Sequence, residues 1–279
     1  MTPEEIKEIL NQSGYLFEQQ VASIIEGLGF HVTTNKAYLD EEEDKSREID
    51  VYGYKVFFEI PGDVSSIGIV YINCECKKSS TPYVFINRKK GIQDQHYVPD
   101  GINLIYNKYY KRIGDNSLTE IEAFTYLNLQ QKHFYTREPY KAVQICKIIQ
   151  NGKKIEAQHS GVIEGFIYPL TKSMKVWKNQ AHSNNTKQRF CKLFLNIAVV
   201  DSQLYTINVD DENPMPIESN YVPFIRGIQS KNIKGTYLFT FVKFDYLKNF
   251  IKNEIEGFCS EVSQKYINDP SLINDQYLY

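Results

Sequence analysis

The segment from Val70 to Lys77 constrains the fold more than any other part of the chain, because two kinds of side chain alternate along it. On a β-strand, successive side chains point to opposite faces of the sheet. One face of this segment carries Val70, Ile72, Cys74 and Cys76, and the other carries Tyr71, Asn73, Glu75 and Lys77. The pattern predicts a strand that packs on one face and presents a carboxylate and an ammonium group on the other.

A second acidic residue belongs to the preceding predicted strand. Asp50 lies in an apolar, β-branched run that ends near Ile60, and residues 61–66 are rich in turn-forming types. Such a turn can fold the next strand back beside the first. We therefore expect Asp50 to lie close to Glu75 and Lys77.

Length and charge limit the classes of protein that fit this chain. With 279 residues it can bury a full core, and its apolar and charged fractions are those of a globular protein. We expect one continuous mixed α/β domain, with a core at about residues 1–115 and a helical and β extension at about 116–279; a domain boundary near residue 115 is the alternative. The net charge of −2 argues against a protein coated with nucleic acid but allows a local basic groove.

The sequence also predicts a cytoplasmic protein with no membrane partner. No apolar run approaches the roughly 20 residues that span a bilayer. The first residues, with Glu4, Glu5 and Lys7, lack the apolar centre of a secretory leader. The five cysteines are scattered without a Cys-x-x-Cys pair, which indicates reduced thiols.

Two helices are expected before the first strand. Thr2 and Glu5 form a capping box that predicts a helix to about Asn11. After Gly14, apolar residues recur at helical spacing over residues 17–28. Glu18 stands at the edge of the buried face of this second helix, where it is either a boundary carboxylate or part of a site with Asp50.

The remaining elements are predicted from capping, turn and periodicity signals. The acidic run at residues 40–44 is expected to be a solvated loop. We expect strands at 30–34, 83–86, 194–200, 204–209 and 237–244, and helices at 117–127, at 139–152 and from about residue 246.

The residue types at the predicted site suit phosphodiester hydrolysis. That reaction needs a metal to offset phosphate charge, a positioned water and a nearby cation. Mg²⁺ takes oxygen ligands and is commonly held by one or two carboxylates. Asp50 and Glu75 fit this role, the backbone carbonyl of Cys76 is a candidate third ligand, and Lys77 is placed to orient or activate the water.

The order of these features resembles the PD-(D/E)-x-K nuclease superfamily: a helix with Glu18, a strand, a strand with Asp50, and a strand with Glu75-Cys76-Lys77. Residues 14–18 leading to residues 29–32 look especially like Mrr-type restriction enzymes and archaeal Holliday-junction resolvases. The resemblance covers about residues 1–90, and it departs from the family motif at Ile49, where a proline would precede the aspartate.

The resemblance implies a restriction-endonuclease-like fold, a central mixed sheet flanked by helices, here with a C-terminal β-rich elaboration. It also implies that Asp50 and Glu75 bind Mg²⁺ or Mn²⁺, that Lys77 assists the attacking water, and that Glu18 joins the metal shell.

A basic segment further along the chain is a candidate nucleic-acid surface. Between Gly165 and Val200 there is no acidic residue, while lysines and arginines surround Trp177. Such residues can contact phosphates, and the tryptophan either stacks on a base or fills the core. Adding the basic residues expected beside the predicted site, the candidates are Lys78, Arg88, Lys89, Lys90, Lys172, Lys175, Lys178, Lys187 and Arg189.

These observations lead to a Mg²⁺-dependent DNA endonuclease of the restriction or defence type as the first hypothesis. A homodimer is expected from the class, because cutting both strands takes two sites. The alternative is a catalytically inactive nucleic-acid-binding or assembly module of the same fold, and an RNA-directed nuclease is a third hypothesis.

Overall fold

The structure is a computed structural model that describes residues 1–113, 117–159, 161–180 and 188–278. Its helices and helical turns are α1 (Pro3–Ser13), α2 (Tyr15–Glu26), η1 (Ile92–His96), α3 (Ala123–Tyr126), η2 (Ile163–Ile167), α4 (Tyr168–Gln180), η3 (Phe244–Tyr246), α5 (Leu247–Phe250), η4 (Ile251–Glu256), α6 (Gly257–Asn268) and α7 (Ser271–Asn274). Its strands are β1 (His31–Asp40), β2 (Lys45–Ile60), β3 (Ser65–Lys78), β4 (Tyr83–Lys89), β5 (Ile102–Asn103), β6 (Lys108–Ile113), β7 (Ser117–Glu122), β8 (Tyr140–Asn151), β9 (Lys154–Gln158), β10 (Gln188–Asp201), β11 (Leu204–Asn208), β12 (Ile217–Ser219), β13 (Tyr221–Gln229), β14 (Lys234–Lys243) and β15 (Tyr277–Leu278).

Local sequence determines the first two helices. Thr2 caps α1 through both hydrogen bonds of the predicted capping box with Glu5. Gly14, at φ 89°, then separates α1 from α2 in a left-handed conformation that favours glycine. The apolar stripe of α2, which includes Phe17 and Val21, is buried, as the helical spacing predicted.

Twelve strands of the described chain form one mixed sheet in the order β1-β2-β3-β10-β14-β13-β8-β4-β11-β12, with β5 paired to β10 and β9 paired to β8. The first three strands form an antiparallel meander. β10 then pairs in parallel with the whole of β3, from Gln188 opposite Ser65 to Asp201 opposite Lys78. The predicted mixed α/β class with a central sheet is confirmed, and the sheet takes strands from both sides of residue 115.

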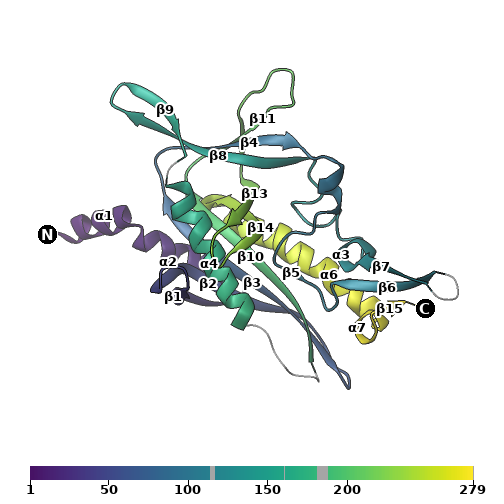
Figure 1. The fold of residues 1–279 in the computed structure, drawn as a ribbon. Coiled ribbons are helices and arrows are strands. Elements are labelled where there is room, and N and C mark those ends of the chain that lie inside the picture. Colours follow the sequence, from purple (N-terminus) through teal and green to yellow (C-terminus); the bar gives the residue numbers. More distant parts are fainter. Residues whose placement is uncertain (114–116, 160, 181–187, 279) are drawn as a thin grey trace.

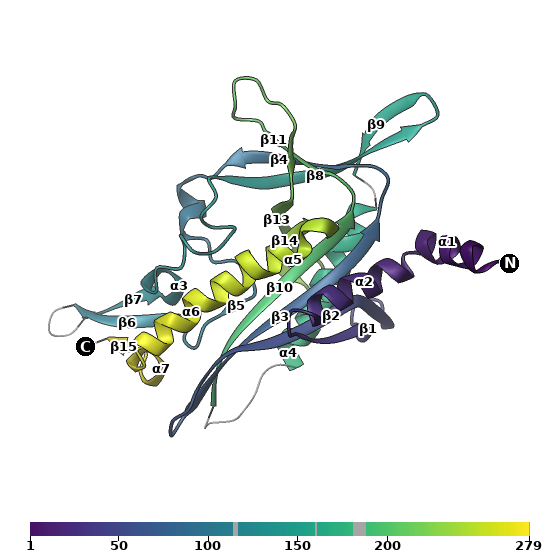
Figure 2. The ribbon, with the colours of Figure 1, turned by 180° about the vertical axis from the view of Figure 1, so that it is seen from behind.

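Helices cover both faces of the sheet. α4 crosses one face (Figure 1), and α2 together with α5, η4 and α6 packs on the other (Figure 2). The alternation predicted for β3 is confirmed, because Ile72 and Cys74 pack in the same cluster as α2. On the opposite face, Asn73 Nδ2 donates to the Leu170 carbonyl of α4 at 3.0 Å and to Asn196 Oδ1 of β10 at 3.0 Å.

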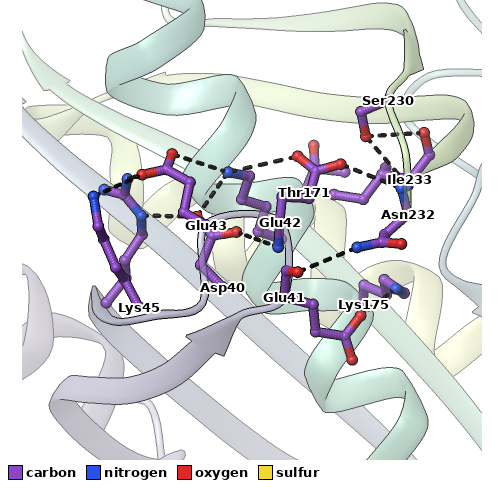
Figure 3. Close-up of polar contacts among 12 residues, drawn as sticks. Asp40, Glu41, Glu42, Glu43, Lys45, Thr171, Lys175, Ser230, Asn232 and Ile233 are labelled. Carbon is purple, nitrogen blue, oxygen red and sulfur yellow. Dashed lines mark hydrogen bonds and ion pairs between the residues drawn. The ribbon is translucent and has the colours of Figure 1, made fainter.

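The tip of the β1–β2 hairpin is held against α4 by ion pairs (Figure 3). Lys172 Nζ lies 2.7 Å from Asp40 Oδ2, and Arg47 Nε lies 2.8 Å from the same oxygen. The prediction of a solvated acidic loop is therefore wrong for Asp40, whose side chain is fully buried under α4. Burial alone would raise the pKa of Asp40, but the hydrogen bonds from Lys172, the Glu42 backbone and Arg47 outweigh burial and lower it.

Two segments predicted as helices are mainly strands. Residues 117–122 form β7 and pair with β6, and only Ala123–Tyr126 is helical. Residues 140–151 form β8, which lies between β4 and β13. In both segments the spacing of apolar residues also fitted a helix, but β-branched residues suit strands. Strand pairing decides the outcome, for β7 with β6 just before it in the chain and for β8 with the distant β4 and β13.

Two further observations concern the state of the cysteines and the character of the helices. All five cysteines are free thiols, as their spacing predicted. Among the described residues, no helix combines the length and the apolar character needed to cross a bilayer.

We expect Lys172→Met to lower the free energy of unfolding by about 3 kcal/mol, because it leaves Asp40 buried with fewer compensating charges. The matched control is Lys175→Met, which removes a more exposed pair with Glu41 at 2.6 Å and should cost less than about 1 kcal/mol. Urea unfolding of the two variants measures the difference. Equal losses would show that the buried pair does not hold the hairpin tip.

Candidate active site

Asp50 occupies a position of β2 that has no backbone partner in either neighbouring strand. β1 pairs with β2 on both sides of this position, through Thr34–Val51 and Lys36–Ile49, but Asp50 itself has no partner in the register. The β2–β3 ladder likewise begins only at Val51 opposite Cys74. In place of a backbone bond, the Asp50 carboxylate Oδ2 accepts the Cys76 N–H at 2.7 Å. The carboxylate is thereby fixed against the edge of β3.

The expected proximity of Asp50, Glu75 and Lys77 is confirmed. Lys77 Nζ lies 2.8 Å from Glu75 Oε2 and 3.4 Å from Asp50 Oδ2. The Glu75 residue is 4 % exposed, whereas the Lys77 side chain is 40 % exposed. One ammonium group therefore bridges two carboxylates, one of which is buried.

Glu18 approaches this cluster from α2 without bonding to it. It is half-buried near the start of the helix, and its hydrogen-bond partner is Asn35 on β1. Burial and the charge of Asp50 raise the pKa of Glu18 above its ordinary value. Among the described residues no hydrogen bond joins Glu18 to Asp50, Glu75 or Lys77, so its place is beside the cluster rather than within it.

Burial and mutual repulsion dominate the electrostatics of the cluster. Burial, followed by the charge of Asp50, raises the pKa of Glu75 to about 8. Burial alone would lower the pKa of Lys77, but the charges of Glu75 and Asp50 outweigh burial and raise it. Two carboxyl groups thus contact one ammonium group, with the Glu18 carboxyl nearby, and a further cation would relieve the repulsion among the acids.

The oxygen atoms present fit the ligand preference of Mg²⁺. Asp50 and Glu75 supply two carboxylates, the number that commonly holds this ion while water fills the other positions. The N–H of Cys76 points toward Asp50, and in a strand the carbonyl of the same residue points to the same side. No cluster of three or more acidic, histidine or cysteine side chains in a metal-holding arrangement occurs among the described residues.

An open pocket of about 470 Å³ gives access to the cluster. Asp50, Glu75 and Lys77 line it on the sheet side. Glu164 lines it from η2, a π-helical turn that leads into α4. π-Helical turns are frequent at functional sites. Molecules in the solvent can therefore approach the two carboxylates and the lysine through this pocket.

Several residues that line this pocket were not predicted from the sequence, among them Tyr38, Arg47 and Glu164. Tyr38 and Arg47 belong to β1 and β2 and also line an adjoining cavity of about 160 Å³ that extends toward Lys172. The Tyr38 hydroxyl is buried and has no hydrogen-bond partner among the described residues. Glu164 is distant in sequence from the other site residues, so only the packing of α4 on the sheet could reveal it. Arg47 lies only three residues before Asp50, so its closeness to the site could have been predicted from the sequence.

All three predicted phosphate-binding residues of α4 form ion pairs within the chain. Lys172 and Lys175 pair with the acidic hairpin tip (Figure 3), and Lys178 Nζ lies 3.0 Å from Asp100 Oδ1. A phosphate would have to compete with these carboxylates. Trp177 is 4 % exposed, with Lys36 Nζ 4.1 Å from its ring centroid, so the core alternative for this tryptophan is confirmed.

The other predicted basic residues lie at several places. Lys78 Nζ is 3.9 Å from Asp201 Oδ2 at the ends of β3 and β10. Arg88 and Lys89 are exposed on β4, which four strands separate from β3 in the sheet, so they do not continue the surface beside Lys77.

Two of the candidates interact mainly within the chain, and one lies outside the described residues. The Lys90 ammonium donates to the carbonyls of Tyr135 and Glu138, and burial lowers its pKa to about 8. The Arg189 guanidinium lies 5.1 Å from the Tyr106 ring centroid. Lys187 is outside the described residues.

We expect Glu75→Gln to change how the stability of the metal-free protein depends on pH. The pKa of a glutamate in the unfolded chain is about 4.3, whereas burial and the charge of Asp50 raise the pKa of Glu75 to about 8 in the fold. Between these values the folded protein holds one more proton than the unfolded chain, so raising the pH should destabilise the wild type relative to the variant. Urea unfolding at pH 5, 6, 7 and 8 measures this, and parallel curves would contradict it.

Comparisons with models of protein families, with curated proteins and with solved structures found no match to this chain.

Proposed function

We propose that this chain is a Mg²⁺-dependent phosphodiesterase, specifically a DNA endonuclease with a restriction-endonuclease-like fold. One observation carries the proposal: Asp50, Glu75 and Lys77 converge at an open pocket although nothing in the stability of a sheet requires it. Placing two carboxylates together at a partly buried position costs free energy unless a cation balances them. A metal-dependent reaction explains that cost.

Each residue has a definite part in the proposed chemistry. Asp50 and Glu75 would hold the metal, with the Cys76 carbonyl as a further oxygen ligand and Glu18 beside them as an additional carboxyl group. The bound ion supplies charge neutralisation at the phosphate. The charges of Glu75 and Asp50 keep Lys77 protonated in this structure, so Lys77 acts as a hydrogen-bond donor that orients the attacking water.

The arrangement of elements supports the nuclease assignment over other metal-dependent hydrolases. Glu18 lies on the helix that precedes the meander, Asp50 lies on its middle strand, and Glu75 and Lys77 lie on its third strand. This is the order on which the resemblance to the PD-(D/E)-x-K superfamily rests.

With Mg²⁺ or Mn²⁺ present, we expect the protein to cleave plasmid DNA, and we expect Asp50→Ala and Lys77→Ala each to lower the rate at least about 100-fold. The control is Glu59→Ala, which removes an exposed carboxylate from the far end of β2. Gel analysis of nicked and linear products measures the rate. Absence of cleavage by the wild type, or cleavage that survives both site substitutions, would overturn the assignment.

A second candidate function is nucleic-acid binding or assembly without catalysis. It is favoured by the Lys77 bridge, which partly satisfies both carboxylates without a metal, and by the pairing of the α4 lysines with acids of the same chain. In this case the residues that resemble a nuclease site would act as a structural ion pair.

Titration calorimetry with a DNA duplex separates the two functions. A nuclease should bind DNA more tightly with Ca²⁺, a non-catalytic substitute, than with EDTA, because the ion offsets the charge of the site on approach of the phosphate. Glu75→Gln should abolish this dependence. DNA affinity indifferent to both the ion and the substitution would favour the binding module, and the same titration with RNA tests the third hypothesis.

A further inference from the structure

A second pocket lies in a part of the sheet that the proposed catalytic site does not use. β13 pairs with β8 at only one described position, Phe224 opposite Ala142, so the two strands diverge on either side of it. β4, β11 and β12 continue the sheet beyond β8, and one residue after β12 the chain enters β13. The strands thus curl around a space of about 300 Å³, lined from β4, β8, β11, β12 and β13. Such spaces within curled sheets commonly bind small molecules.

A pair of side-chain amides forms one wall of this pocket. Asn87 of β4 and Asn208 of β11 lie opposite each other in the parallel register, and Asn87 Nδ2 donates to Asn208 Oδ1 at 3.1 Å. Asn87 Oδ1 is buried and has no partner among the described residues. One bond between two carboxamides always leaves a carbonyl oxygen and an NH₂ group, whichever way the amides are oriented. The wall therefore presents an acceptor beside a donor.

Aromatic rings and hydroxyl groups form the rest of the lining. Tyr135, Tyr140 and Tyr221 contribute rings, and the hydroxyls of Thr206 and Ser219 lie 3.5 Å apart on neighbouring strands. The Tyr135 residue is 1 % exposed and its hydroxyl has no partner among the described residues. Buried polar groups in folded proteins are normally hydrogen-bonded. These unpaired groups indicate a polar ligand rather than an apolar one.

The charge of the residues that line the pocket limits the kinds of ligand that it can bind. Of the described residues that line the pocket, Glu138 alone is charged, and it is negative. A phosphate group within the pocket would be repelled, whereas an uncharged group would not. The pocket suits a flat, polar and neutral molecule that offers a donor next to an acceptor and a face for stacking. A nucleobase has these properties.

We propose that this pocket binds a nucleobase, with Asn87 and Asn208 contacting its polar edge and the rings of Tyr140 and Tyr221 contacting its face. The base has two sources, a free nucleoside or an unstacked nucleotide of a bound strand. Arg88 and Lys89 follow Asn87 on β4, are exposed, and are the basic residues nearest to Asn87 in sequence, so they are the candidates for contact with the phosphates of a strand. This binding is independent of the metal-dependent chemistry at Asp50.

The first test is calorimetric titration of the full chain with adenosine, guanosine, cytidine and thymidine, without metal. We expect at least one to bind with a Kd below about 1 mM and Asn208→Leu to weaken that binding at least 10-fold. The matched control, Asn253→Leu, makes the same change at an exposed position of η4. If Asn208→Leu does not fold by circular dichroism, Thr206→Val replaces it, because it removes one lining hydroxyl at constant shape.

The second test covers the strand source and uses a single-stranded oligonucleotide against the same oligonucleotide with abasic positions. Weaker binding of the abasic strand, lost in Asn208→Leu and reduced by Arg88→Ala, supports a base held within a strand. Binding of a free nucleoside, sensitive to Asn208→Leu, supports a small-molecule source. The proposal is overturned if no nucleoside binds and base removal leaves oligonucleotide affinity unchanged. Asp50→Ala should alter neither result, so failure here is distinguishable from failure of the nuclease proposal.

Discussion

The parallel pairing of β10 with β3 is the contact on which the rest of the structure depends. It spans the whole of β3 and makes this strand interior on both edges, since β2 occupies the other. The apolar side chains of β3 then contribute to the core with α2, and Asn73 joins β3, β10 and α4 in one buried hydrogen-bond group. Glu75, which by alternation lies on the same face of β3 as Asn73, is buried, whereas Lys77, near the end of the strand, remains partly exposed. The position of β3 in the sheet thus places the candidate site.

Electrostatics distinguishes two acidic groups that look alike in the sequence. At the hairpin tip, Asp40 receives hydrogen bonds from Lys172, from Arg47 and from the Glu42 backbone, and these lower its pKa despite burial. At the candidate site, Glu75 has one bridging lysine and two neighbouring carboxyl groups, and its pKa rises to about 8. The charge of Asp40 is balanced within the chain, and its ion pairs hold β1 and β2 against α4. Glu75 remains short of positive charge and faces an open pocket, which is the condition expected of a site that takes up a cation.

Sequence predicted those parts of the fold whose signals are local. The capping box at Thr2, the break at Gly14 and the alternation of β3 each depend on a few neighbouring residues, and each is confirmed. The proximity of Asp50 to Glu75 followed from one turn. The strands β7 and β8 were mistaken for helices because their partners β6, β4 and β13 lie far away in sequence or were themselves not predicted. Glu164 and the ion pairs of Lys172 could not be predicted, since only the packing of α4 on the sheet brings these residues to their partners.

A crystal structure of the protein soaked in Mn²⁺ would show, through the anomalous signal of the metal, whether Asp50 and Glu75 hold one divalent ion. We predict a single peak within about 2.0–2.3 Å of a carboxylate oxygen of each residue, with Lys77 Nζ moved away from its bridging position. A map without a peak between these carboxylates, in which Lys77 still bridges Asp50 and Glu75, would contradict it.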